Sequence, residues 1–196
     1  MVHSRPVPAS AGWCRTNPGQ YVKPDGSLIG LLILRPDGTL LTSVQVTSHE
    51  ELDTEPLPET GTYTVVVQLF SGATTANLKL TLSEPKMSSI ENQSAFVELK
   101  RPGQDARLTF EGTKGRSVEL HIKLLDLSPV DSLVGVSIHK ADGKILGSAQ
   151  VAPGADFESE DNIITEPLDE SGICTVVVNP FAGAMSARVL LELRRL

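Results

Sequence analysis

One stretch of the chain, TEPLPETGTYTVVV at residues 54–67, decides the fold because it occurs twice. Residues 165–178 read TEPLDESGICTVVV, and ten of the fourteen positions are identical. Self-similarity at a long, fixed spacing is typical of a repeated structural unit. The 196 residues therefore contain two copies of one unit.

The match extends to both sides of this stretch. Downstream, NLKLTL at 77–82 corresponds to RVLLEL at 188–193, with the same spacing of 111 residues. Upstream, GLLILRPDGTLLTSVQV at 30–46 corresponds to GVSIHKADGKILGSAQV at 135–151, with a spacing of 105 residues. The second copy thus carries six additional residues, which we place within VAPGADFESEDNI at 151–163. An acidic insertion of this kind is typical of a surface loop.

Apolar and polar residues alternate within each copy, for example at 62–69 and at 118–124. A period of two predicts antiparallel strands with one face in the core. PDG at 36–38 and ADG at 141–143 lie between apolar runs, where glycine supplies the positive φ of a tight hairpin. No segment shows a helical period. We predict an all-β fold of two tandem antiparallel β-sandwich units of the jelly-roll-like kind.

The two copies differ in what precedes them. Further strands are predicted at 94–100, 106–112 and 116–127 ahead of the second copy, but residues 1–27 are rich in Pro and Gly and match none of them. We therefore predict an irregular segment at 1–27, a truncated sandwich repeat at 28–84, a linker at 85–92 and a complete sandwich at 93–196. A truncated sandwich leaves sheet edges exposed, so we expect it to associate through an edge strand with another chain.

The block PLPETGTYTVVV…GATTANLKLTL, with ARLTFEGTKGRSVELHI and ILRPDGTLL, resembles β-sandwich repeats of large bacterial surface and secreted proteins. It is similar to the bacterial pre-peptidase C-terminal domain family over residues 28–84 and 93–196. The resemblance implies a non-catalytic spacer, stalk or auxiliary domain of an exported protein, secreted or at the cell surface. We expect the chain to be a fragment of a longer repeat protein, and its first residues contain no recognisable signal peptide.

The family's motif, Gly-x-Tyr-x-Val-x-Val, begins at Gly61 and Tyr63 in the first copy and at Gly172 and Cys174 in the second. The tyrosine can bury its ring while its hydroxyl reaches backbone at the corner before the strand. LPETG at 57–61 matches a sortase pattern, but it lies in mid-chain before a strand, so we interpret it as a turn. Cys174 replaces the tyrosine, and we expect a small buried thiol there rather than a bridge to Cys14.

Composition and missing motifs exclude several classes of function. A net charge of −7 disfavours nucleic acid and anionic membranes as partners, and aromatic residues make up only 4% of the chain. The histidines lack metal-ligand spacing and no GxSxG motif occurs, so we predict no enzyme activity and no cofactor. The alternative is a calcium- or glycan-binding adhesion module. Its calcium candidates are the carboxylates inside the insertion: Asp156, Glu158, Glu160 and Asp161.

Overall fold

The computed structural model describes residues 13–16, 21–23, 28–46, 51–54, 57–70, 75–77, 80–83, 85–90, 93–154, 159–181 and 184–196. The chain divides into two compact units, unit 1 at Met1–Glu84 and unit 2 at Pro85–Leu196. Every regular element in the described ranges is a β-strand, which confirms the all-β prediction. Within the same ranges there is no helix with the length and apolarity to cross a membrane.

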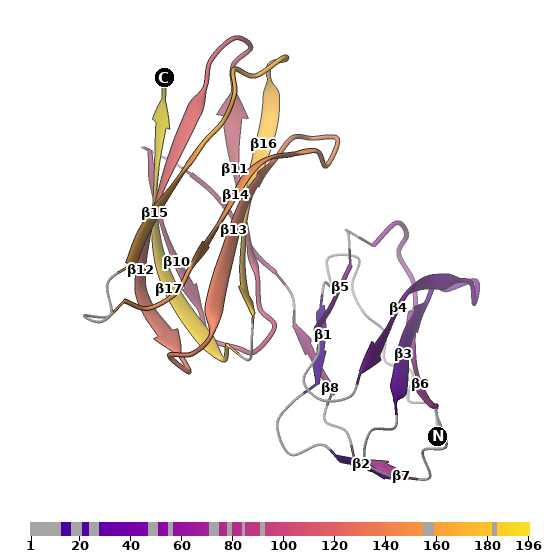
Figure 1. Cartoon of the computed structure of the whole chain (residues 1–196). Helices are drawn as coiled ribbons and strands as arrows, with labels where there is room; N and C mark the ends of the chain where they lie inside the picture. Colours follow the sequence, from indigo (N-terminus) through magenta and orange to yellow (C-terminus); the bar gives the residue numbers. More distant parts are fainter. Residues whose placement is uncertain are drawn as a thin grey trace. The chain divides into compact units, whose positions relative to one another are not determined.

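Unit 2 is a sandwich of two sheets (Figure 1). The sheets have the strand orders β10-β17-β12-β15 and β14-β13-β16-β11-β9. All pairs are antiparallel except the parallel pair of β9 with β11. The strands are β9 (Lys86–Ser89), β10 (Ser94–Leu99), β11 (Ala106–Gly112), β12 (Val118–Ser128), β13 (Leu133–His139), β14 (Ile145–Val151), β15 (Ser159–Ile164), β16 (Gly172–Phe181) and β17 (Ser186–Arg195).

The core of unit 2 follows from the period of two. Alternate residues of β12, β16 and β17 are buried, and Leu120, Ile122 and Leu124 are fully inaccessible to solvent. Burying such a side chain stabilises the fold by about 1.5–3 kcal/mol. Because both sheets contribute to one cluster, the interior is continuous across the sandwich.

Unit 1 has two three-stranded sheets, β5-β1-β8 and β4-β3-β6, and a two-stranded ribbon, β2-β7. Its buried cluster is much smaller and consists of Ile29, Leu31, Ile33, Leu52 and Tyr63. The strands are β1 (Trp13–Thr16), β2 (Tyr21–Lys23), β3 (Ile29–Leu34), β4 (Leu40–Val46), β5 (Glu51–Asp53), β6 (Thr64–Leu69), β7 (Thr75–Asn77) and β8 (Leu80–Ser83).

The two units share their strand pairing. The order β4-β3-β6 in unit 1 corresponds to β14-β13-β16 in unit 2, and β5-β1-β8 corresponds to β15-β12-β17. The registers agree as well: Leu31 pairs with Val67 as Val136 pairs with Val178. Unit 2 then adds β10 beside β17, β11 beside β16, and β9 beside β11.

Both hairpins adopt the predicted turns. Gly38 has a φ of +83° and Gly143 a φ of +85°, which confirms the positive φ expected of these glycines. Asp37 and Asp142 stabilise the turns in the same way, since each carboxylate accepts a hydrogen bond of 2.9 Å from the backbone N–H two residues on. The turn is therefore conserved between the copies although its first residue is not.

Two predicted boundaries are wrong. Residues 1–27 include β1 and β2, and β1 pairs on both sides, with β5 and with β8. Residues 85–92 include β9, which pairs with β11. Both segments are short and lack clear alternation, so the period of two gives no signal for a strand there. All four residues of β9 are exposed, so its sequence carries no burial signal.

Candidate functional site

The outer face of the sheet β10-β17-β12-β15 gathers the charged side chains of unit 2. In β12 the residues between the buried ones are Glu119, His121 and Lys123, and they point away from the core. Neighbouring strands place Glu160 beside Lys123 and Glu192 beside His121. We call this set the charged face; it comprises Glu119, His121, Lys123, Glu160, Asn162, Glu192 and Arg194.

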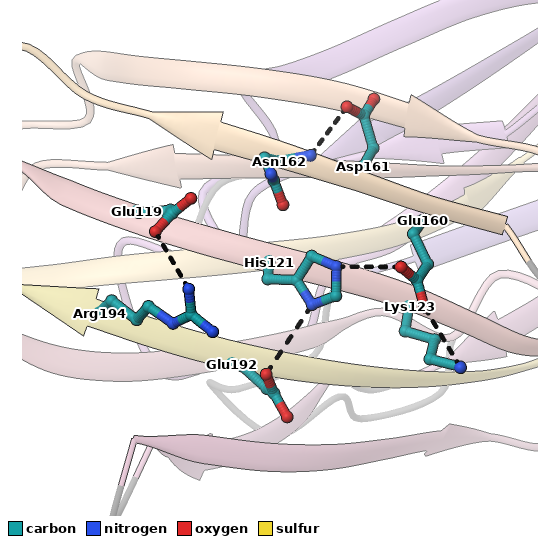
Figure 2. Close-up of polar contacts among 8 residues, drawn as sticks. All are labelled: Glu119, His121, Lys123, Glu160, Asp161, Asn162, Glu192 and Arg194. Carbon is teal, nitrogen blue, oxygen red and sulfur yellow. Dashed lines mark hydrogen bonds and ion pairs between the residues drawn. The ribbon is translucent and has the colours of Figure 1, made fainter.

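Figure 2 shows that the ionisable side chains of the charged face contact one another across the strands. His121 lies between two carboxylates, with Nε2 3.4 Å from Glu160 and Nδ1 3.8 Å from Glu192. The ammonium of Lys123 is 3.2 Å from Glu160, and it holds the pKa of that carboxyl below its usual value. Opposite charges on adjacent strands stabilise the pairing of those strands.

The calcium candidates do not come together in the described residues. Glu160 and Asp161 lie within β15 and not in a loop, so the prediction of an acidic loop is wrong at these two positions. Glu160 points toward His121 and Lys123, whereas Asp161 accepts a hydrogen bond of 2.8 Å from the backbone N–H of Asn162 (Figure 2).

Asp156 and Glu158 lie outside the described residues. Within the described ranges, no group of three or more His, Cys, Asp or Glu side chains could hold a metal ion. The calcium site stays a prediction that would depend on those two residues.

A serine and a histidine meet on β13. Ser137 Oγ lies 2.7 Å from His139 Nε2, the distance that a base needs to activate a nucleophile. They are two residues apart on one strand, so the period of two alone brings them to one face. In the described part of the chain no carboxylate contacts His139, and a triad would need one to orient the ring.

Phe96 carries an aromatic ring on the outer face of the sheet β10-β17-β12-β15 and is 49% exposed. The guanidinium carbon of Arg188 lies 5.5 Å from the ring centroid, a cation–π contact. Arg188 thus covers one face of the ring. A sugar could stack only on the other face.

The repeated motif lies at the corner that leads into β6 in unit 1, whereas Gly172 and Cys174 lie within β16 in unit 2. Tyr63 is buried, and its hydroxyl donates a hydrogen bond of 2.9 Å to the carbonyl of Glu59. Cys174 takes the equivalent place in unit 2 as a free, buried thiol. Burial raises the pKa of this thiol, so it is protonated at neutral pH and a poor nucleophile.

The two motif glycines have different roles. A Cβ added to Gly61 would lie 2.4 Å from Pro36 Cγ, so only glycine allows this close approach. Gly172 has no atom within 4 Å of such a Cβ. Close packing therefore requires glycine at position 61, whereas the space around position 172 would also admit a side chain.

A second ionic cluster closes the same corner in unit 2. Lys140 Nζ lies 2.9 Å from Asp169 and 2.7 Å from Glu170. Its side chain is 10% exposed, and the two acceptors raise the pKa of the ammonium well above its usual value. In the first copy the same positions read Arg35, Pro58 and Glu59, so this cluster is specific to unit 2.

No protein-family model and no curated protein matches the chain. Among solved structures, it is similar to PliG of Aeromonas hydrophila, a periplasmic inhibitor of g-type lysozyme, with 10% identity and a TM-score of 0.40 over 58% of this chain and 99% of that one. A carbohydrate-binding module of the β-sandwich superfamily shows 11% identity and a TM-score of 0.34 over 100% and 96% of the two chains.

The isomalto-dextranase of Arthrobacter globiformis T6, complexed with panose, shows 12% identity and a TM-score of 0.32 over 98% of this chain and 36% of that one. At such values no function or ligand passes from any of these three proteins to this chain.

Proposed function

We propose that the chain is a non-catalytic β-sandwich module, a spacer, stalk or auxiliary domain of an exported bacterial protein, secreted or at the cell surface. One observation carries the proposal: the ionisable side chains of the charged face are engaged with one another on the open face of a sheet. A catalytic group needs a pKa and a position matched to a substrate.

The pair of Ser137 and His139 is the strongest argument for an enzyme, so it supplies the test. A fluorophosphonate probe forms a covalent bond with an activated serine, and we expect it to leave the chain unlabelled. Ester and peptide substrates should likewise remain intact. Labelling that is lost in Ser137→Ala but kept in Ser148→Ala, a serine paired opposite it on β14, would overturn the proposal.

The calcium-binding alternative has a separate test. A ligand that binds only the folded state raises the melting temperature by mass action. We expect millimolar calcium to leave the melting temperature unchanged. A rise that disappears when Asp156 and Glu158 are both changed to alanine would instead support the adhesion module, while loss of the rise in Glu160→Gln alone would place the ion at β15.

A further inference from the structure

The sheet β4-β3-β6 of unit 1 ends where its counterpart in unit 2 continues. β16 lies between β13 and β11, but β6, its equivalent, pairs only with β3 among the described residues. An edge strand presents unpaired backbone N–H and C=O groups. β6 reads TVVVQL, without a charge or a proline, which are the devices that usually protect such an edge. The edge strand β15 of unit 2, by contrast, carries Glu160 and Asp161.

Three residues of unit 1 that match core residues of unit 2 are open to solvent, although Leu31 and Tyr63 are buried as their counterparts are. Val67 is 41% exposed, whereas Val178, at the same place in the repeat, is completely buried. Leu80 and Leu82 of β8 are 38% and 46% exposed, and their equivalents Leu191 and Leu193 are at most 1% exposed. The opening therefore reaches both sheets of unit 1.

Unit 2 shows which element closes this opening. β11 pairs antiparallel with β16, with Ala106 opposite Val178, Leu108 opposite Val176 and Phe110 opposite Cys174. The side chains of Ala106, Leu108 and Phe110 are no more than 5% exposed and belong to the same core cluster as Leu191 and Leu193. A strand at this position thus supplies both backbone hydrogen bonds and the missing part of the core.

We propose that unit 1 is a strand acceptor: β6 binds an extended segment of another polypeptide with apolar side chains at alternate positions, as in Ala106–Gly112. The segment pairs antiparallel with β6 and places a small residue opposite Val67 and larger ones opposite Val65 and Tyr63. Binding by strand addition draws its affinity from backbone hydrogen bonds and its specificity from the alternate side chains. This inference goes beyond the proposed spacer function.

A second copy of β6 is a poorer occupant. Its inward side chains are Val65, Val67 and Leu69, which do not match the sequence of small, large and aromatic residues at this position in unit 2. A β11-like segment brings Leu and Phe, whose larger side chains fill the equivalent space in unit 2. The repeat therefore favours the heterologous segment, because its order of side-chain sizes is the one that closes the equivalent position in unit 2.

The test uses the full chain and a dye-labelled synthetic peptide, DARLTFEG, which corresponds to residues 105–112. Fluorescence anisotropy should report saturable binding, and hydrogen exchange should slow at the amides of β6. The exchange of β16 amides, already paired on both sides, serves as an internal reference. A peptide with Asp in place of Leu108 and Phe110 should bind at least about tenfold more weakly, because an inward carboxylate has no partner there.

Matched variants of the acceptor locate the site. Val67→Lys places an ammonium in the opening and should weaken binding at least about tenfold, whereas Gln68→Lys adds the same charge on the outward side and should leave binding unchanged. Fluorescence of the single tryptophan, Trp13, checks that unit 1 stays folded in both variants. The substituted peptide keeps the test valid even if Val67→Lys unfolds.

Four results would overturn the proposal. They are no binding at millimolar peptide, equal binding of the two peptides, a monomeric free chain whose β6 amides are already protected, and a dimer by light scattering with β6 protected. The third result would show that the chain covers its own edge, and the fourth that a second copy does. None of them bears on catalysis, which the serine probe tests by itself.

Discussion

The hydroxyl of Tyr63 donates a hydrogen bond of 2.9 Å to the carbonyl of Glu59, and the N–H of Glu59 points back to the same oxygen at 3.4 Å. One buried side chain thus holds both backbone groups of a residue four positions earlier. This contact closes the LPETG corner directly before β6. It explains why LPETG, although it matches a sortase pattern, forms a turn that leads into a strand.

Tyr63→Phe removes this hydroxyl and keeps the ring. We expect the free energy of unfolding of unit 1 to fall by about 1 kcal/mol, the usual net value of an internal hydrogen bond. Urea denaturation followed by Trp13 fluorescence measures it, since Trp13 is in unit 1. Thr62→Ser, at the exposed neighbouring residue, is the control and should unfold at the wild-type midpoint.

Val67 and Val178 are equivalent in the repeat but differ in burial, and alanine substitutions should show it. Val178→Ala removes fully buried methyl groups and leaves a cavity, so we expect a loss of about 2 kcal/mol in unit 2. Val67→Ala should cost less than about half of this, because Val67 is 41% exposed. Hydrogen exchange of β16 and β6 amides measures each unit separately. Equal losses would contradict the open position of Val67.

Cys174 should react only when unit 2 opens. Because burial raises its pKa and hides the sulfur, we expect a thiol reagent at neutral pH to label it far more slowly in the folded chain than in urea. The experiment uses Cys14→Ser, so that a single thiol remains. Labelling at the rate of a free cysteine in the folded state would show that the thiol is accessible.

Lys140 should make the stability of unit 2 depend on acid pH. Its hydrogen bond is the main cause that lowers the pKa of the Asp169 carboxyl below the ordinary 3.8. The folded state therefore favours the ionised carboxylate. This stabilisation is complete above the unfolded pKa and is lost as the pH falls through the lowered one.

We expect the unfolding free energy of Lys140→Met to decline less than that of the wild type as the pH falls below about 4. The matched control is Lys144→Met, which removes a charge from the same hairpin but leaves the hydrogen bonds of Lys140 in place. Thermal melting from pH 6 to pH 2 measures the difference. Identical pH profiles for Lys140→Met and the wild type would show that the ion pair does not stabilise the fold.

The repeat predicted the fold well wherever one face of a strand is buried. The alternation at residues 118–124 places Leu120 and Ile122 inside, and the structure agrees. The hairpin glycines were also predictable, because few other residues adopt a φ near +83° or +85°. Both features depend on residues close together in the sequence, so a single segment is enough to predict them.

Pairing between distant segments could not be predicted in the same way. β1 shares no sequence pattern with β12, and only its register, with Cys14 opposite Leu82, identifies it as the equivalent strand. Glu160 looked like part of an acidic loop because its partners, His121 and Lys123, lie almost forty residues earlier on β12. The sequence of one strand cannot show which charged residue of another strand will lie beside it.

The connection between the units has a mechanical consequence. β8 ends at Ser83 and β9 begins at Lys86, so any pull transmitted along the chain enters unit 2 at an edge strand. All four residues of β9 are exposed, so peeling them from β11 sacrifices little apolar contact and lengthens the tether by roughly 13 Å. Ile90 then resists further extension, because its side chain is buried in the core and its N–H is bound to Thr109. We therefore expect β9 to detach first when the chain is stretched, while the sandwich behind it stays folded.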